Sequence, residues 1–230
     1  MYQKWLEILM KSALFRGFST EDLLGILDCL KPRVASYKKN EFITMAGENL
    51  TGVGIILSGE VAVTKENAVG NRIIIAVLKP GEMFGETAAF SGSAVWPATV
   101  LAQAASTVLC LPPEKIVRGC EKACLSHHNL ITNMLRTISD KALMLNQKVE
   151  YFLIKSIRGK ITTYLLEQYQ ETGSSTLILP LNRNDLADFL NVSRPSLSRE
   201  MCRMRDEGII EFHRSSVYIK DAEAMRKMIE

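Results

Sequence analysis

The C-terminal part of the chain carries two apolar stripes with helical spacing, joined by a short polar turn. The first stripe consists of Leu186, Phe189 and Leu190, and the second consists of Leu197, Met201 and Met204. Asn182 and Ser193 each precede a stripe and carry the side-chain oxygen that an N-cap needs. Asn191, between the stripes, tolerates a left-handed backbone better than most residues. The pattern predicts a helix-turn-helix.

The exposed face of the second predicted helix is basic and rich in hydroxyl groups. Its candidate DNA-binding residues are Arg194, Ser196, Ser198, Arg199 and Arg203. Arginine pairs with the edge of guanine and serine with base edges or phosphates, so this face is predicted to enter a DNA major groove. Two β-rich runs, Ile209–Arg214 and Ser215–Lys220, follow Gly208 and predict a two-stranded wing. The alternative is an amphipathic helix that only packs and leaves its basic face in water.

Between residues 33 and 112 the pattern changes to short β-rich runs separated by glycine-containing turns. The runs are Glu41–Thr44, Val53–Leu57, Val61–Lys65, Arg72–Leu78, Ala98–Leu101 and Thr107–Leu111. Such regular spacing, with glycine at the reversals, predicts an antiparallel β-barrel. The fold class is therefore expected to be α+β, with domains at residues 1–125, 126–153 and 154–230.

The middle domain, residues 126–153, reads as one long helix with an apolar stripe of the heptad type. We call this stripe the seam; its residues are Ile131, Leu135, Ile138, Ala142, Leu145, Val149 and Phe152. Apolar positions that alternate by four and three residues predict a partner helix, and hence a homodimer. Two-fold symmetry would also set two recognition helices one DNA turn apart. Packing of the seam on the chain's own barrel is the alternative.

The composition of the chain excludes some classes of protein but does not by itself indicate a function. The chain has 230 residues and a net charge of only +3, so the positive charge that matters is local to the recognition helix. The absence of a long apolar run predicts no membrane contact and a cytoplasmic protein. The odd number of cysteines, five, favours a reducing compartment. No histidine lies between residues 33 and 112, which argues against a cupin-like metalloenzyme, and we expect no enzymatic activity.

This order of domains resembles the bacterial CRP/FNR family, the cyclic-AMP receptor protein and its relatives, over nearly the whole chain. The resemblance rests on Gly47-Glu48, Ser58-Gly59-Glu60-Val61, Pro80-Gly81-Glu82, Phe84-Gly85-Glu86 and the segment Val192–Arg199. It implies a cyclic-nucleotide-binding-like jelly roll that senses a small signal, a dimerisation helix, and winged helices that bind a palindromic promoter site in double-stranded DNA. It also implies contact with RNA polymerase. Ser198 and Arg199 match base-reading residues of FNR-like members, whereas Pro195 replaces a glutamate that reads bases in many members.

The predicted effector pocket departs from the members that bind cyclic AMP. Its candidate residues are Phe84, Gly85, Glu86, Thr87, Trp96, Pro97, Leu145 and Asn146. Those members carry a phosphate-clamping arginine about ten residues after the Phe-Gly-Glu motif, where this chain has Trp96 and Pro97. A buried phosphate without a cationic partner is costly. We therefore expect no cyclic AMP binding, and favour an apolar or aromatic small-molecule effector.

Three other signals are left open. Residues 1–28 hold no cysteine, so the N-terminal iron-sulfur ligands of some family members are missing. Cys120, Cys124, His127 and His128 provide soft ligands for a haem- or thiol-based redox sensor, but their spacing fits no standard zinc pattern, so haem is disfavoured and no metal site is assigned. A regulator that binds DNA without any effector is the third alternative.

Overall fold

The computed structural model describes residues 2–66, 72–93, 95–118 and 125–228. The chain divides into two compact units, residues 1–141 and 142–230. The helix α5 (Leu125–Leu153) runs without interruption across the boundary between them. None of the described helices is long and apolar enough to cross a membrane.

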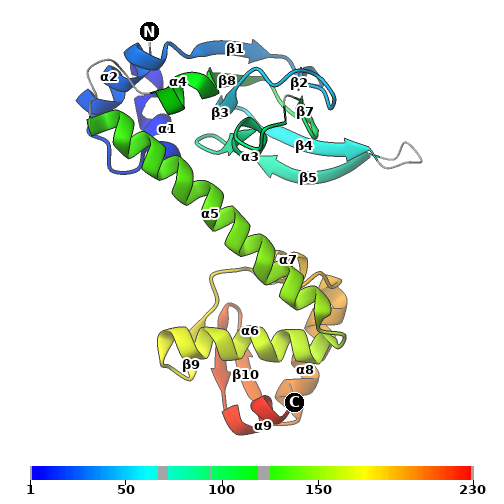
Figure 1. Ribbon diagram of the computed structural model, residues 1–230. Helices are drawn as coiled ribbons and strands as arrows, with labels where there is room; N and C mark the ends of the chain where they lie inside the picture. Colours follow the sequence, from blue (N-terminus) through cyan, green and yellow to red (C-terminus); the bar gives the residue numbers. More distant parts are fainter. Residues whose placement is uncertain (1, 67–71, 94, 119–124, 229–230) are drawn as a thin grey trace. The chain divides into compact units, whose positions relative to one another are not determined.

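The first unit is built around two antiparallel sheets (Figure 1). One sheet has the order β1 (Arg33–Tyr37), β8 (Ser106–Leu111), β3 (Val53–Ser58) and β6 (Met83–Phe84). The other has the order β2 (Phe42–Thr44), β7 (Thr99–Ala102), β4 (Val61–Glu66) and β5 (Arg72–Leu78). Each sheet contains neighbouring strands that are distant along the chain. The predicted antiparallel β architecture is confirmed.

Alternation along β3 explains how this unit forms two cores. Val53, Ile55 and Leu57 face a helical layer, whereas Ile56 joins a cluster between the sheets. Both faces of the strand are covered, which is why β3 reads as a continuous apolar run instead of an alternating one.

The helical layer comes from both ends of the unit. Its short elements are η1 (Gln3–Trp5), α1 (Leu6–Lys11), η2 (Ala13–Phe15), α2 (Thr20–Leu30) and α4 (Pro113–Arg118), and α3 (Glu86–Ala89) follows β6. Ser19 caps α2 through a complete capping box with Asp22. The Asn133 amide of α5 donates to the carbonyls of Leu14 and Arg16 at 3.0 and 2.9 Å, which fixes the N-terminal segment on α5.

The second unit contains α6 (Ile157–Thr172), α7 (Arg183–Phe189), α8 (Arg194–Asp206) and α9 (Ala222–Lys227), packed with a small sheet. The sheet has the order β10 (Ile210–His213), β11 (Ser216–Ile219) and β9 (Thr176–Ile178). The predicted two-stranded wing is confirmed as β10 and β11, and β9 adds a third strand that was not predicted. Leu177 of β9 is buried in the core of the unit, so this strand closes the sheet over the helices.

Candidate functional site

The helix-turn-helix forms as its caps predict. The Asn182 side chain accepts hydrogen bonds from the backbone N–H groups of Asn184 and Asp185 at 2.9 and 3.1 Å, which starts α7. Asn191 adopts φ +50° in the turn, the left-handed conformation that its side chain tolerates. Ser193 Oγ then accepts from the N–H of Ser196 at 3.3 Å and starts α8.

The two faces of α8 separate cleanly. Leu197, Met201 and Met204 are fully buried, so the helix cannot rotate without exposing its core side chains. On the other face Arg194, Arg199 and Arg203 are exposed, and Ser196 and Ser198 are half-buried. The five predicted DNA-binding residues therefore reach the surface of α8. Arg199 Nη2 donates to Ser196 Oγ at 3.2 Å, which orders the N-terminal end of this face.

A cluster of ion pairs holds α8 against α6, and the sequence pattern did not point to it. Arg158, in the first turn of α6, donates from Nε to Glu200 Oε1 at 2.6 Å. Its two terminal nitrogens donate to the two oxygens of Glu207 at 2.7 Å each. The hydrogen bonds that Arg158 donates to Glu207 first, and then to Glu200, raise its pKa above the ordinary value. Glu200, the one acid within the basic stretch of α8, is thereby paired.

A second basic group lies near the wing. The guanidinium of Arg205 stands 5.7 Å from the centre of the Phe212 ring, and that of Arg183 stands 5.0 Å from the same ring. Arg205 also pairs with Asp206 at 2.9 Å. These contacts engage the Arg205 guanidinium within its own unit, although its side chain is 41% exposed.

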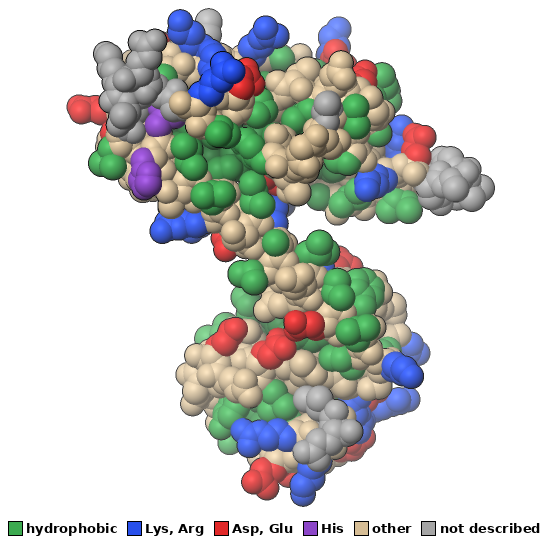
Figure 2. Space-filling model, in the orientation of Figure 1, with side chains coloured by type: hydrophobic (Ala, Val, Ile, Leu, Met, Phe, Trp, Pro, Cys, Tyr) green, Lys and Arg blue, Asp and Glu red, His purple; other side chains and the backbone are tan. Residues whose placement is uncertain are grey.

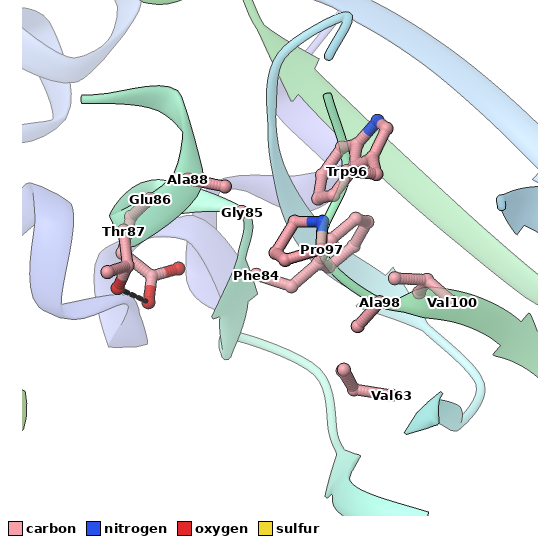
Figure 3. Close-up of a pocket in the computed structure, with 10 residues that line it drawn as sticks. All are labelled: Val63, Phe84, Gly85, Glu86, Thr87, Ala88, Trp96, Pro97, Ala98 and Val100. Carbon is pink, nitrogen blue, oxygen red and sulfur yellow. Dashed lines mark hydrogen bonds between the residues drawn. The ribbon is translucent and has the colours of Figure 1, made fainter. Parts of the chain in front are cut away.

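In the first unit, six of the eight predicted pocket residues line one cavity of about 110 Å³ (Figure 3). These six are Phe84, Gly85, Glu86, Thr87, Trp96 and Pro97, and the remaining lining residues are Val63, Ala88, Ala98 and Val100. None of the described residues that line it is an arginine or a lysine. The other two predicted pocket residues, Leu145 and Asn146, belong to the second unit and are exposed there.

Glycine lets the walls of the cavity approach each other. A Cβ at Gly85, which has φ +85°, would lie 2.5 Å from the Trp96 ring, and one at Gly54 would lie 2.2 Å from the Phe84 ring. The two rings pack with centroids 5.7 Å apart. Backbone hydrogen bonds to Gly47 and Glu48 hold Trp96 from both sides. The apolar walls are thus fixed by packing and by the backbone.

Glu86 is the charged member of the lining, and it is 4% exposed. Lys141 of α5 donates to its Oε1 at 2.5 Å. The other oxygen, Oε2, is buried and has no hydrogen-bond partner among the described residues. Lys141 is not one of the seam residues, and no spacing in the sequence connects it with Glu86.

The seam of α5 is largely exposed. Leu135, Leu145, Val149 and Phe152 are between 49% and 62% exposed, and Figure 2 shows hydrophobic side chains on the surface around the C-terminal half of this helix. Ile138 differs, because it packs partly against the core of the first unit. Ile131 is also half-buried. Ile138 therefore serves its own unit as well as the stripe, which its spacing alone did not indicate.

The described residues give little support to the hypotheses of a haem- or thiol-based redox sensor or a metal site. Cys120 and Cys124 lie outside the described residues. His127 is buried, and its Nε2 donates to the carbonyl of Lys115 at 3.3 Å. Within the described part of the chain, no group of three or more histidine, cysteine or acidic side chains is arranged to hold a metal ion. Burial raises the pKa of the Cys110 thiol, whereas Cys29 is exposed, contrary to its apolar sequence context.

Both units match known protein families. Residues 34–123 match the cyclic nucleotide-binding domain, and residues 159–228 match the Crp-like helix-turn-helix domain. The chain belongs to the CRP/FNR family. As a CRP/FNR transcription regulator it binds DNA through its helix-turn-helix and carries an effector-binding domain, and it is not an enzyme.

Individual relatives are distant but span the chain. It is 21% identical over 227 residues to the CRP-like cAMP-activated global transcriptional regulator of Mycobacterium tuberculosis, covering 96% of this chain and 98% of that one. It is 23% identical over 217 residues to the cyclic AMP receptor protein of Thermus thermophilus, covering 94% and 96%. The fold is similar to that of a CooA mutant from Carboxydothermus hydrogenoformans, with 18% identity, a TM-score of 0.54 and coverage of 98% and 95%.

Proposed function

We propose that this CRP/FNR regulator acts as a homodimer that binds a palindromic promoter site through two copies of α8. The observation that carries the proposal is the exposed basic face of a helix whose opposite face is fully buried. Arg194 and Arg199 stand near the helix start, where side chains of a recognition helix meet base edges. The exposed seam on α5 supports the dimer, because solvent-exposed apolar stripes of this extent usually mark an interface.

The cavity beside Glu86 is the proposed site of the signal. Fixed apolar walls with one buried carboxylate are the usual make-up of a small-molecule site. The described lining residues include no arginine or lysine that could pair with a cyclic phosphate. We therefore propose an effector other than cyclic AMP, although two of the relatives are named for that nucleotide. The proposal also includes contact with RNA polymerase and a cytoplasmic location.

Selection from a library of random duplexes tests the proposal directly. The full chain should enrich a sequence with two-fold symmetry and half-sites about one helical turn apart. Its complex with the selected duplex should sediment with two protein chains per site. Enrichment of a single unsymmetrical half-site, or a complex with one chain, would contradict the dimeric reading. A failure to enrich any sequence would contradict base reading by α8.

A further inference from the structure

The cavity in the first unit has one unmet chemical requirement. Glu86 Oε1 receives the Lys141 ammonium at 2.5 Å, and the Thr87 hydroxyl lies 3.5 Å from the same oxygen. Glu86 Oε2 is buried without a partner among the described residues, and Figure 3 shows it directed toward the side of Phe84. An ionised carboxylate oxygen only accepts hydrogen bonds. A ligand that satisfies it must therefore supply an O–H or N–H donor.

The charge of the site decides which donors fit. Glu86 and Lys141 form an ion pair, so their charges cancel next to the apolar lining. An anionic ligand would place a second negative charge beside Oε2. A cationic ligand would leave a net positive charge in a cavity whose walls are mostly apolar. Only a neutral donor meets Oε2 without adding an uncompensated charge.

Size and shape restrict the ligand further. The cavity of about 110 Å³ is somewhat smaller than the roughly 150 Å³ apolar cavity that accepts benzene in another protein. The Phe84 and Trp96 rings and the glycine contacts behind them keep it from expanding easily. The size of this space favours a ligand of about one ring over a nucleotide.

We propose that this cavity binds a neutral, monocyclic or similarly small apolar molecule that donates one hydroxyl or N–H hydrogen bond to Glu86 Oε2. The proposal rests on the proposed function only in naming the class of signal for the same cavity. Lys141 is then a specificity-determining residue, because it cancels the charge that would otherwise recruit an amine.

Four probes of similar size, together with cyclic AMP, test this inference on the full chain by calorimetry and ligand-observed NMR. Phenol is the neutral donor, toluene lacks the donor, benzoate is anionic and benzylamine is cationic. Phenol should bind saturably, and each of the other three probes should show a Kd at least tenfold higher. Cyclic AMP should not bind. Equal affinity for phenol and toluene, or tighter binding of benzoate or cyclic AMP, would overturn the proposal.

Variants locate the donor contact. Glu86→Met removes the acceptor in a side chain of similar length, so the Kd for phenol should rise at least tenfold while that for toluene stays the same. Lys141→Met leaves Glu86 without its cation, and the preference should reverse from phenol to benzylamine. Lys141 is half exposed, so this variant is expected to fold, and a gained affinity cannot come from misfolding. An unchanged preference in Lys141→Met would refute the charge argument.

DNA binding by the same preparations separates this inference from the proposed function. Binding of a selected duplex without binding of phenol would overturn the ligand class alone. Binding of phenol by a protein that selects no duplex would overturn the proposed DNA-site reading and leave the cavity assignment standing.

Discussion

Replacing Arg158 by methionine removes three short hydrogen bonds that connect the start of α6 to α8. The Glu207 side chain is 46% exposed, so solvent screens this pair and its share of the lost free energy is small. The Glu200 side chain is only 14% exposed and keeps one weak partner, Arg203 at 3.4 Å. Leaving a charge of this kind nearly unpaired costs about 1–3 kcal/mol. We expect Arg158→Met to lower the stability of the second unit by about 2 kcal/mol in total.

Calorimetry and circular dichroism measure this loss in the full chain. A domain of this size loses roughly 4–8 °C in Tm per kcal/mol, so the transition of the second unit should fall by roughly 8–16 °C. Trp5 and Trp96 both lie in the first unit, and their fluorescence therefore reports a transition that should not move. Lys220→Met is the matched control, because Lys220 and Glu211 form an exposed pair at 3.0 Å in the same unit. Lys220→Met should lower the Tm of the second unit much less than Arg158→Met does, because solvent screens this exposed pair.

The pH dependence of the free energy of unfolding gives an independent check of the Arg158 ion pairs. Hydrogen bonds from Arg158 hold the pKa of Glu207 below its ordinary value of 4.5. This pair therefore stabilises the folded state fully above pH 4.5, and its contribution is lost as the pH falls through the lower folded-state pKa. The difference in stability between the wild type and Arg158→Met should narrow in acid. Equal losses for Arg158→Met and Lys220→Met at pH 7 would refute the argument from the burial of Glu200.

Three further predictions concern binding and assembly. Arg199→Ala should lose about 1–3 kcal/mol of discrimination at one base pair per half-site in competition assays, and equal binding to specific and random duplexes by mutant and parent would contradict its role. Leu135→Asp should shift sedimentation toward the monomer. Ser139→Asp, on the same helix but outside the seam, should leave the dimer intact. A wild-type protein that is monomeric at micromolar concentration would contradict the proposed dimer. Calorimetry should detect no micromolar binding of cyclic AMP or cyclic GMP, and binding that disappears in Glu86→Ala would contradict this expectation.

Local patterns predicted the elements whose signals are local. The caps at Asn182 and Ser193 and the left-handed Asn191 follow from the chemistry of single residues, and all three were correctly placed. Of the strands found in advance, β3, β4 and β5 lie between glycine-containing turns, whereas β2, β7 and β8 were found from their β-rich composition. The missed strands β6 and β9 have two and three residues, too few to show a period of two. β1 was missed because its burial pattern, mostly exposed with two half-buried positions, gives no clear alternation.

The polar pairs that shape both sites were not predictable in this way. Lys141 and Glu86 are 55 residues apart in sequence, and Arg158 lies 42 and 49 residues from Glu200 and Glu207. No spacing rule connects such residues, because their distance depends on how two distant elements pack. The same holds for Ile138, whose heptad position was clear but whose contact with the core of its own unit depends on tertiary structure.

Glu86 and Glu200 show the same physical arrangement in the two units. Each carboxylate is largely buried beside a surface proposed for binding, and each is paired with a cation from a different helix. A buried charge is tolerated only with such a partner, so the partner controls what else the site accepts. At Glu200, Arg158 removes a negative charge from the face that is proposed to meet phosphates. At Glu86, Lys141 removes the charge that would select amines and leaves one oxygen for a neutral donor. If both proposals hold, the supporting cation sets the specificity of each site as much as the residue that faces the ligand does.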